Sequence, residues 1–281
     1  MKIQIICQIA VTGALLLAAS QVQAQVTPYS DGDLLLNFRD ISSTTPPNLT
    51  VDEGNINTFL SSVPAGTTET LVSATTLSGA MGAPTSANQV GFSAAAGLSS
   101  SATLWMTRVF TAAQATPIGL QTGSTETHKS SELTASTQGQ IDTQLFNIGQ
   151  GYNAGTQVGT LNAATVSSSD PTSYATQTVL TGIMSYHGLE STTTGAGGAI
   201  EGVQAAATPA TVYEALWELP ASATAGSIAG DIYEGYFTFQ TDGEVDFTAA
   251  GAVPEPSTYV LLALGGMFVI AFRRQIRSLF A

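Results

Sequence analysis

Asp231 to Phe247 spells DIYEGYFTFQTDGEVDF, and this stretch decides the fold class. Apolar residues recur at every second position, stop at Thr241-Asp242-Gly243, and then resume. Two alternating runs on either side of an Asp-Gly pair predict a β-hairpin. The expected apolar face consists of Tyr233, Phe237, Phe239, Val245 and Phe247, with Glu244 and Asp246 on the other face.

The segment just before the hairpin, Val212 to Leu219, shows the same alternation. Its expected apolar face consists of Tyr213, Ala215, Trp217 and Leu219, and Glu214 and Glu218 are expected to point toward solvent. Three consecutive antiparallel strands with one apolar face need a second layer to cover it. The sequence therefore predicts a mainly β protein, an antiparallel β-sandwich of which a jelly roll is one form. A solenoid is the lesser alternative, because no repeat of fixed period occurs.

Short runs earlier in the chain indicate more strands. They are expected at 33–39, 70–76, 89–94 and 103–110. The first of them places Leu34, Leu36 and Phe38 on one face. The last is expected to be buried on both faces, because Leu104 and Met106 alternate with Trp105 and Val109.

Two segments between these strands predict other structure. The glycine-rich stretch 149–159 predicts a loop. Asp170 followed by Pro171 predicts the start of a short helix that runs to Leu180, because aspartate is a good N-cap and proline suits the first helical position.

The N-terminal 24 residues have the layout of a secretory signal peptide. Lys2 precedes a largely apolar stretch, 3–19, and small residues precede an expected cleavage between Ala24 and Gln25. An uncleaved membrane anchor is the alternative, but the apolar stretch is short for one. Cys7 is the single cysteine of the chain and would leave with this segment. The mature domain would then have neither disulfides nor cysteine-based sites.

The C-terminus begins with Val253-Pro254-Glu255-Pro256-Ser257-Thr258 and continues with an apolar run, 259–272. As a helix that run would span roughly 21 Å, a marginal length for a hydrocarbon layer of about 30 Å. The flanking residues fit a span, with Tyr259 at the outer interface and Arg273, Arg274 and Arg277 on the cytoplasmic side. A buried helix of the domain would explain the apolar run but not the terminal arginines.

This order of motif, apolar run and arginine cluster resembles the PEP-CTERM sorting domain. The resemblance implies export in an exopolysaccharide-producing Gram-negative bacterium and recognition by an exosortase, a membrane-embedded cysteine protease-transpeptidase. It also implies cleavage near Pro254-Glu255-Pro256, followed by loss of the helix. The segment Tyr29–Leu36 is similar to an opening strand found in a group of PEP-CTERM proteins.

These features divide the chain into a signal peptide at 1–24, an exported β domain at 25–252 and a sorting signal at 253–281. The central part has three basic residues against nineteen acidic ones, a net charge of −16 with histidine neutral. Nucleic-acid binding is excluded as a function, since it depends on cations that neutralise phosphates.

The central part lacks the common sequence signatures of catalytic and metal-binding sites. His128 and His187 lack a second histidine at helical spacing, and no Gly-x-Ser-x-Gly elbow occurs. Glu214 and Glu218 would lie roughly 13 Å apart on one strand, more than the separation of glycosidase carboxylates. Clustered carboxylates suit a structural calcium ion, and the candidate ligands are Asp31, Asp33 and Asp242, the last beside Glu244 and Asp246.

The sequence thus predicts a non-enzymatic surface or extracellular-matrix protein. Its expected partners are the Sec export machinery, signal peptidase, an exosortase and exopolysaccharide, with transient insertion into the inner membrane. The first alternative is a carbohydrate-binding module that stacks sugars on Trp105, Trp217, Tyr213 or Tyr236. The second is an extracellular hydrolase, which would need an acidic pair or a Ser-His pair converging in a cleft.

Overall fold

The computed structural model describes residues 27–42, 47–110, 135–159, 162–179, 201–204, 211–219 and 232–250. Within these ranges the strands are β1 (Asp33–Asp40), β2 (Pro47–Asn55), β3 (Thr68–Val72), β4 (Val90–Leu98), β5 (Thr103–Phe110), β6 (Thr156–Gln157), β7 (Ala163–Ser167), β8 (Gly202–Gln204), β9 (Val212–Leu219), β10 (Ile232–Phe239) and β11 (Val245–Ala249). The helices are α2 (Ile56–Ser62), α3 (Ala74–Met81), α5 (Ala135–Ala154) and α6 (Tyr174–Val179).

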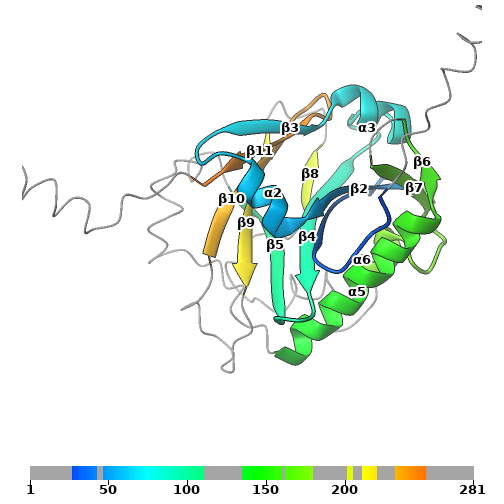
Figure 1. Ribbon diagram of the computed structural model, residues 1–281. Coiled ribbons are helices and arrows are strands. Elements are labelled where there is room, and N and C mark those ends of the chain that lie inside the picture. The colour runs from blue at the N-terminus through cyan, green and yellow to red at the C-terminus, as the bar shows by residue number, and fades with distance from the viewer. Residues whose placement is uncertain are drawn as a thin grey trace, which may run out of the picture.

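The described strands form one antiparallel sheet in the order β3-β11-β10-β9-β5-β4-β1-β2-β7-β6, and β8 also pairs with β4 (Figure 1). The prediction of a mainly β, antiparallel protein is confirmed. The sandwich, and the jelly roll as one form of it, are not confirmed, because the second layer comes from the same sheet. The sheet is strongly curled, so that one half covers the other.

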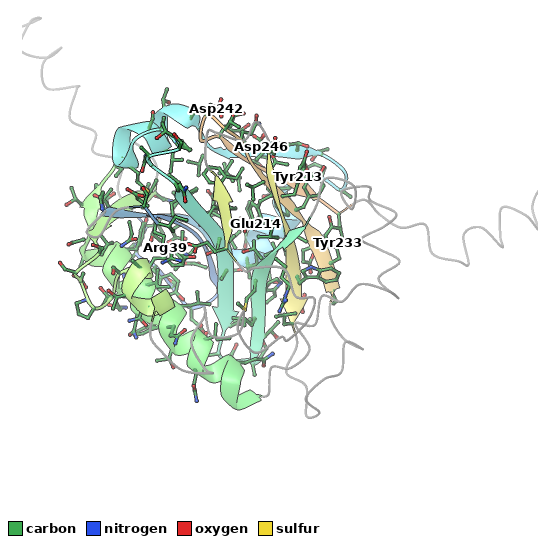
Figure 2. The ribbon with its side chains drawn as sticks, turned by 180° about the vertical axis from the view of Figure 1, so that it is seen from behind. Arg39, Tyr213, Glu214, Tyr233, Asp242 and Asp246 are labelled. Carbon is green, nitrogen blue, oxygen red and sulfur yellow. The ribbon has the colours of Figure 1, made fainter. Side chains whose placement is uncertain are left out.

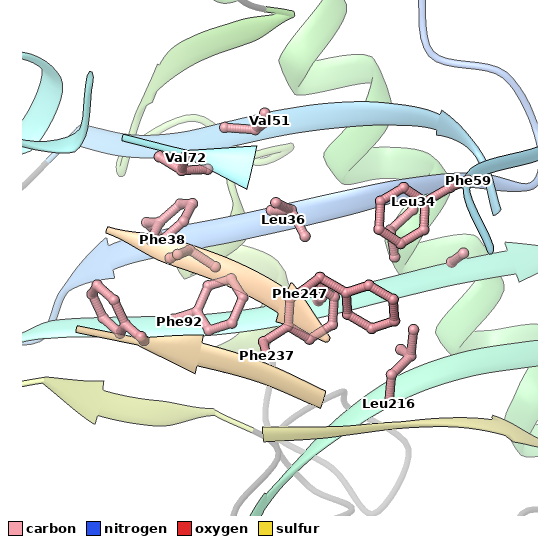
Figure 3. Close-up of a cluster of buried hydrophobic side chains, with 14 of the residues drawn as sticks. Leu34, Leu36, Phe38, Val51, Phe59, Val72, Phe92, Leu216, Phe237 and Phe247 are labelled. Atoms are coloured by element: carbon pink, nitrogen blue, oxygen red, sulfur yellow. The ribbon is translucent and has the colours of Figure 1, made fainter. Parts of the chain in front are cut away.

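The curl encloses the main core between β1 and β4 on one side and β10 and β11 on the other (Figure 3). Phe92 of β4 lies 5.6 Å from Phe237 and 5.7 Å from Phe239, measured between ring centroids. Phe237 in turn lies 4.8 Å from Phe247 of β11. These rings are fully buried, so the inner face of the curled sheet is an aromatic and aliphatic core.

The outer face of the sheet carries a second core beneath α5, which runs diagonally across it (Figure 1). Ile141, Leu145 and Ile148 of α5 pack against Leu35 and Met106 of the sheet. Strands β1, β4 and β5 are therefore buried on both faces, as predicted for 103–110. The helices α2 and α3 pack against β2, and Asn55 and Ser73 cap their N-termini.

Several strand predictions are confirmed and others need correction. The strands at 33–39, 89–94, 103–110 and 212–219 and the 231–247 hairpin are present. In contrast, β3 ends at Val72, and the predicted strand residues 74–76 start α3 instead. Ser73 accepts the backbone N–H of Thr76, and this cap favours the helix over a longer strand.

The predicted loop 149–159 is also wrong over its first half, because α5 continues to Ala154. Its glycines permit close packing: a Cβ at Gly149 would overlap the ring of Tyr29, and one at Gly151 would lie 2.7 Å from the carbonyl oxygen of Thr172. The helix predicted from Asp170 begins later, at Tyr174. Asp170 instead accepts the N–H of Thr172 within a turn.

The two faces of β9 are the opposite of the prediction. Tyr213, Ala215 and Trp217 do share a face, but it is the outer one. Leu216 lies in the main core, and Glu214, predicted to be solvated, is fully buried on that inner face. The reason is that a curled sheet with two cores buries both faces of a strand, which alternation alone does not reveal.

Candidate functional site

Four partly exposed aromatic rings gather on the outer face of β9 and β10, a group we call the aromatic patch. They are Tyr213 and Trp217 of β9 and Tyr233 and Tyr236 of β10. The ring centroids of Trp217 and Tyr233 are 5.3 Å apart, and those of Tyr213 and Tyr236 are 6.3 Å apart. Figure 2 shows Tyr213 and Tyr233 along this pair of strands. Ala215 lies between the two ring pairs and is covered by them.

A register shift in β10 places Tyr233 in the patch. Tyr233 pairs with Trp217, but Gly235 pairs with Leu216, so Glu234 is an extra residue. Gly235 adopts a φ of +144°, and a Cβ there would collide with the backbone of β11. The prediction that Tyr233 shares the inner face with Phe237 is therefore wrong, because the bulge reverses the alternation.

The patch has the chemistry of a sugar-binding platform. Ring faces offer apolar surface to the C–H groups of a pyranose, and the tyrosine hydroxyls offer hydrogen bonds, whereas the indole N–H of Trp217 is buried. Burial, with a smaller effect of Tyr236, raises the pKa of Tyr233, so its phenol stays neutral at physiological pH. Trp105, also predicted as a stacking residue, is 3% exposed in the main core and cannot offer a face to a ligand.

Glu218 and Glu234 form a carboxyl pair beside the patch. Burial, a hydrogen bond with Glu218 and the charge of Glu218 raise the pKa of Glu234 to about 7. A hydrogen bond between two carboxyl groups holds their oxygens within about 3 Å of each other. Their separation is then shorter than the roughly 5–9.5 Å between glycosidase carboxylates. This pair does not provide the geometry of a glycosidase.

The first calcium candidates lie at the start of β1. The carboxylate of Asp31 accepts the hydroxyl of Ser99 at 2.6 Å, and that of Asp33 accepts the N–H of Ser30 at 2.6 Å. Both carboxylates therefore hold turns together. Among the residues that the structure describes, no three acidic or histidine side chains lie close enough to hold a metal ion.

The second calcium candidate, Asp242, belongs to the turn of the β10–β11 hairpin. It accepts the N–H of Glu244 at 3.0 Å, while Gly243 takes a φ of +97°. Asp246 accepts hydrogen bonds from Thr70 at 2.6 Å and from Gln240 at 2.8 Å. These oxygens serve the turn and the pairing of β11 with β3.

A buried polar network connects four distant parts of the chain. Arg39 donates two hydrogen bonds to Glu201, at 2.7 and 2.5 Å. Tyr174 donates to the same carboxylate at 3.2 Å and lies 2.7 Å from the hydroxyl of Ser93. Gly91 leaves room for it, since a Cβ there would lie 2.5 Å from Glu201. The network joins β1, β4, α6 and the residue before β8, and its bidentate geometry points to a structural role.

Sequence reasoning missed this network and the carboxyl pair. Arg39 and Glu201 are 162 positions apart, and nothing in either local pattern links them. One feature of the sequence could have indicated the bulge at Glu234, namely Gly235, a glycine within a strand pattern.

Other candidate residues lie outside the described part of the chain. They are His128, His187, the processing residues Ala24, Gln25, Pro254, Glu255 and Pro256, and the topology residues Tyr259, Arg273, Arg274 and Arg277. In the part that is described, none of the helices combines the length and the apolar character needed to cross a membrane.

Comparison with known families decides the nature of the C-terminal segment. Residues 252–275 match the family of the PEP-CTERM protein-sorting motif. The match begins two residues after the last described residue, Ala250, and includes Pro254-Glu255-Pro256, Tyr259 and the first two arginines of the cluster. Arg277 follows the matched range. A search of curated proteins and a search of solved structures found no match.

The PEP-CTERM motif confirms the resemblance drawn from the sequence and indicates an exported protein targeted to an exosortase. It covers the C-terminal segment alone. What the β domain does must be argued from the domain itself.

Proposed function

We propose that this chain is a non-enzymatic surface or matrix protein that an exosortase processes at Pro254-Glu255-Pro256. The Sec machinery exports it, signal peptidase cleaves between Ala24 and Gln25, and the C-terminal helix inserts briefly into the inner membrane. The product is then held in, or released through, exopolysaccharide. The observation that carries this proposal is the PEP-CTERM motif at residues 252–275.

The described part of the domain supports a scaffold role. Arg39 and Glu201 form an ion pair in its interior, and the carboxylates of Asp31 and Asp242 hold turns at its surface. The net charge of −16 in residues 25–252 favours solubility in a hydrated matrix.

The experiment is to identify the mature termini. The full chain is expressed in a Gram-negative host with and without a functional exosortase, and intact mass is measured in each cell fraction. We expect a product starting at Gln25 and ending near residue 254 only when the exosortase is present. A variant with alanine at Pro254, Glu255 and Pro256 should keep its tail. An intact 281-residue chain in the cytosol would refute the proposal.

The aromatic patch favours a second candidate function, carbohydrate binding. Its occupant would be the exopolysaccharide through which the processed protein passes, since neighbouring aromatic rings with tyrosine hydroxyls suit sugars. Polysaccharide co-sedimentation tests this function with Trp217→Ala and Tyr233→Ala. Phe146→Ala is the matched control, because Phe146 is 53% exposed on α5, away from the patch. Equal retention of all three variants would remove the patch from consideration.

The third candidate, an extracellular hydrolase, has less support. The carboxyl pair of Glu218 and Glu234 is hydrogen-bonded rather than spaced for a glycosidase. Assaying Glu218→Gln and Glu234→Gln for release of reducing sugar from matrix polysaccharide tests it. If the unmodified protein releases reducing sugar and either variant does not, the result would support the hydrolase function.

A further inference from the structure

The last strand of the sheet is fixed firmly up to the point where the chain leaves it. The carbonyl of Ala249 accepts the N–H of Gly66 at 3.1 Å, and the N–H of Ala249 donates to Thr67 at 3.1 Å. The N–H of Ala250 then donates to the carbonyl of Glu234 at 2.9 Å. Because β11 has a paired strand on each side, β3 and β10, Ala250 is an anchored end.

The sorting motif follows this anchor at a short distance. Pro254 lies four residues after Ala250. Even a fully extended chain covers no more than about 14 Å in four residues. A domain of the size of residues 25–252 has a radius of gyration of about 17 Å. An enzyme that holds Pro254-Glu255-Pro256 in its active site must therefore touch the folded domain.

The position of the anchored end, Ala250, determines which surface of the domain the enzyme touches. Around it lie the exposed turn 64–67, the start of β10 and Glu234, which together we call the exit end. Ile232 at the start of β10 is 51% exposed. The hairpin turn 241–243 lies at the other end of β10, roughly 25 Å away for eight residues of strand. Figure 2 shows Asp242 and Tyr233 at opposite ends of this hairpin.

We propose that the exit end is the surface through which the folded domain docks on the exosortase while its tail is cleaved. The inference rests on the proposed processing and adds the surface that takes part in it. The surrounding lipid is the less suitable contact, because the domain carries a net charge of −16 and lipid headgroup surfaces are often anionic. Ile232, a large apolar side chain exposed at the exit end, suits contact with a protein surface.

Site-directed cross-linking tests the docking on the full chain. The single natural cysteine is Cys7, so introduced cysteines in the domain can be labelled selectively once the signal peptide is removed. A short photoactivatable group is attached at Ala65→Cys or Ile232→Cys, both exposed at the exit end. Thr241→Cys, exposed at the far turn, is the matched control. We expect cross-links to the exosortase from the first two positions and none from the third.

A spacer variant separates docking from mere proximity. A Gly-Ser insertion of about 12 residues after Gly251 adds a reach of roughly 20 Å. If the exit end docks, the cross-link from Ile232→Cys persists in the spacer variant at half its yield or more. Loss of that cross-link, or equal cross-linking from Thr241→Cys, overturns the inference. Cleavage is followed in parallel: a chain that is cleaved without exit-end cross-links refutes the docking alone, whereas an uncleaved chain refutes the processing.

Discussion

The rings of Phe38 and Phe239 lie 5.9 Å apart, although three strands separate β1 from β10 in the sheet. In a flat sheet four strand spacings of about 4.8 Å would put them roughly 19 Å apart. The contact therefore requires the curl, and it closes the core that Phe92 shares with both rings. The curl in turn leaves the outer face of β9 and β10 for the aromatic patch.

Truncation of Phe239 should lower the stability of the whole domain. Phe239→Ala removes a fully buried ring that contacts β1 and β4 across the curl, and we expect a loss of about 3–5 kcal/mol in the free energy of unfolding. Urea denaturation followed by tryptophan fluorescence measures it. Phe146→Ala is the control and should change stability by less than about 0.5 kcal/mol. Similar losses in both variants would mean that the core does not join the two halves of the sheet.

Two glycines of α5 should respond in opposite ways to alanine. Gly139 has open space around it, so Gly139→Ala should stabilise the domain by about 0.5–1 kcal/mol through helix propensity. At Gly149 the added methyl group would overlap the ring of Tyr29, so Gly149→Ala should destabilise it by about 1–3 kcal/mol. Thermal unfolding of the two variants gives the comparison. A stabilising Gly149→Ala would show that α5 does not pack on Tyr29 as described.

These glycines also show which parts of the fold could be predicted from the sequence and which could not. Alternation located β1, β5, β9 and the β10–β11 hairpin, because strand period is a local property. No helix was predicted for α5, and its last residues, 149–154, were predicted to be a loop because glycines normally weaken helices. The reason for these glycines is a tertiary contact.

The candidate site could also be predicted only in part, because some of its features depend on tertiary structure. Trp217, Tyr213 and Tyr236 could be named from the sequence, but Tyr233 enters the patch only through the bulge at Glu234. The inward position of Glu214 depends on the curl, which is a property of the whole sheet. The sorting motif, in contrast, is a linear signal, so it could be identified from the sequence alone.

Loss of the ion pair between Arg39 and Glu201 should be costly. Glu201→Ala removes the carboxylate from a guanidinium whose side chain is 14% exposed, and we expect a loss of about 3–5 kcal/mol. The double variant Arg39→Met with Glu201→Leu should recover much of it, because apolar side chains of similar volume replace both charges. Denaturant midpoints of the three proteins measure the coupling. A double variant no better than the single one would show that the pair is required for more than neutralising charge.

The stability of the domain should fall as the pH rises from about 4 to about 7. Burial is the largest cause that raises the pKa of Asp52, Glu53 and Glu234, each to about 7, well above the ordinary values of aspartate and glutamate. The folded state therefore binds more protons than the unfolded state across this range, so raising the pH favours unfolding until about pH 7, above which the effect levels off.

Urea midpoints measured across this window provide the test, and Glu234→Gln should flatten the slope of stability against pH. Repulsion among the acidic surface charges would give the same sign, but about 1 M salt screens it. A slope that disappears in that salt would contradict burial as the cause.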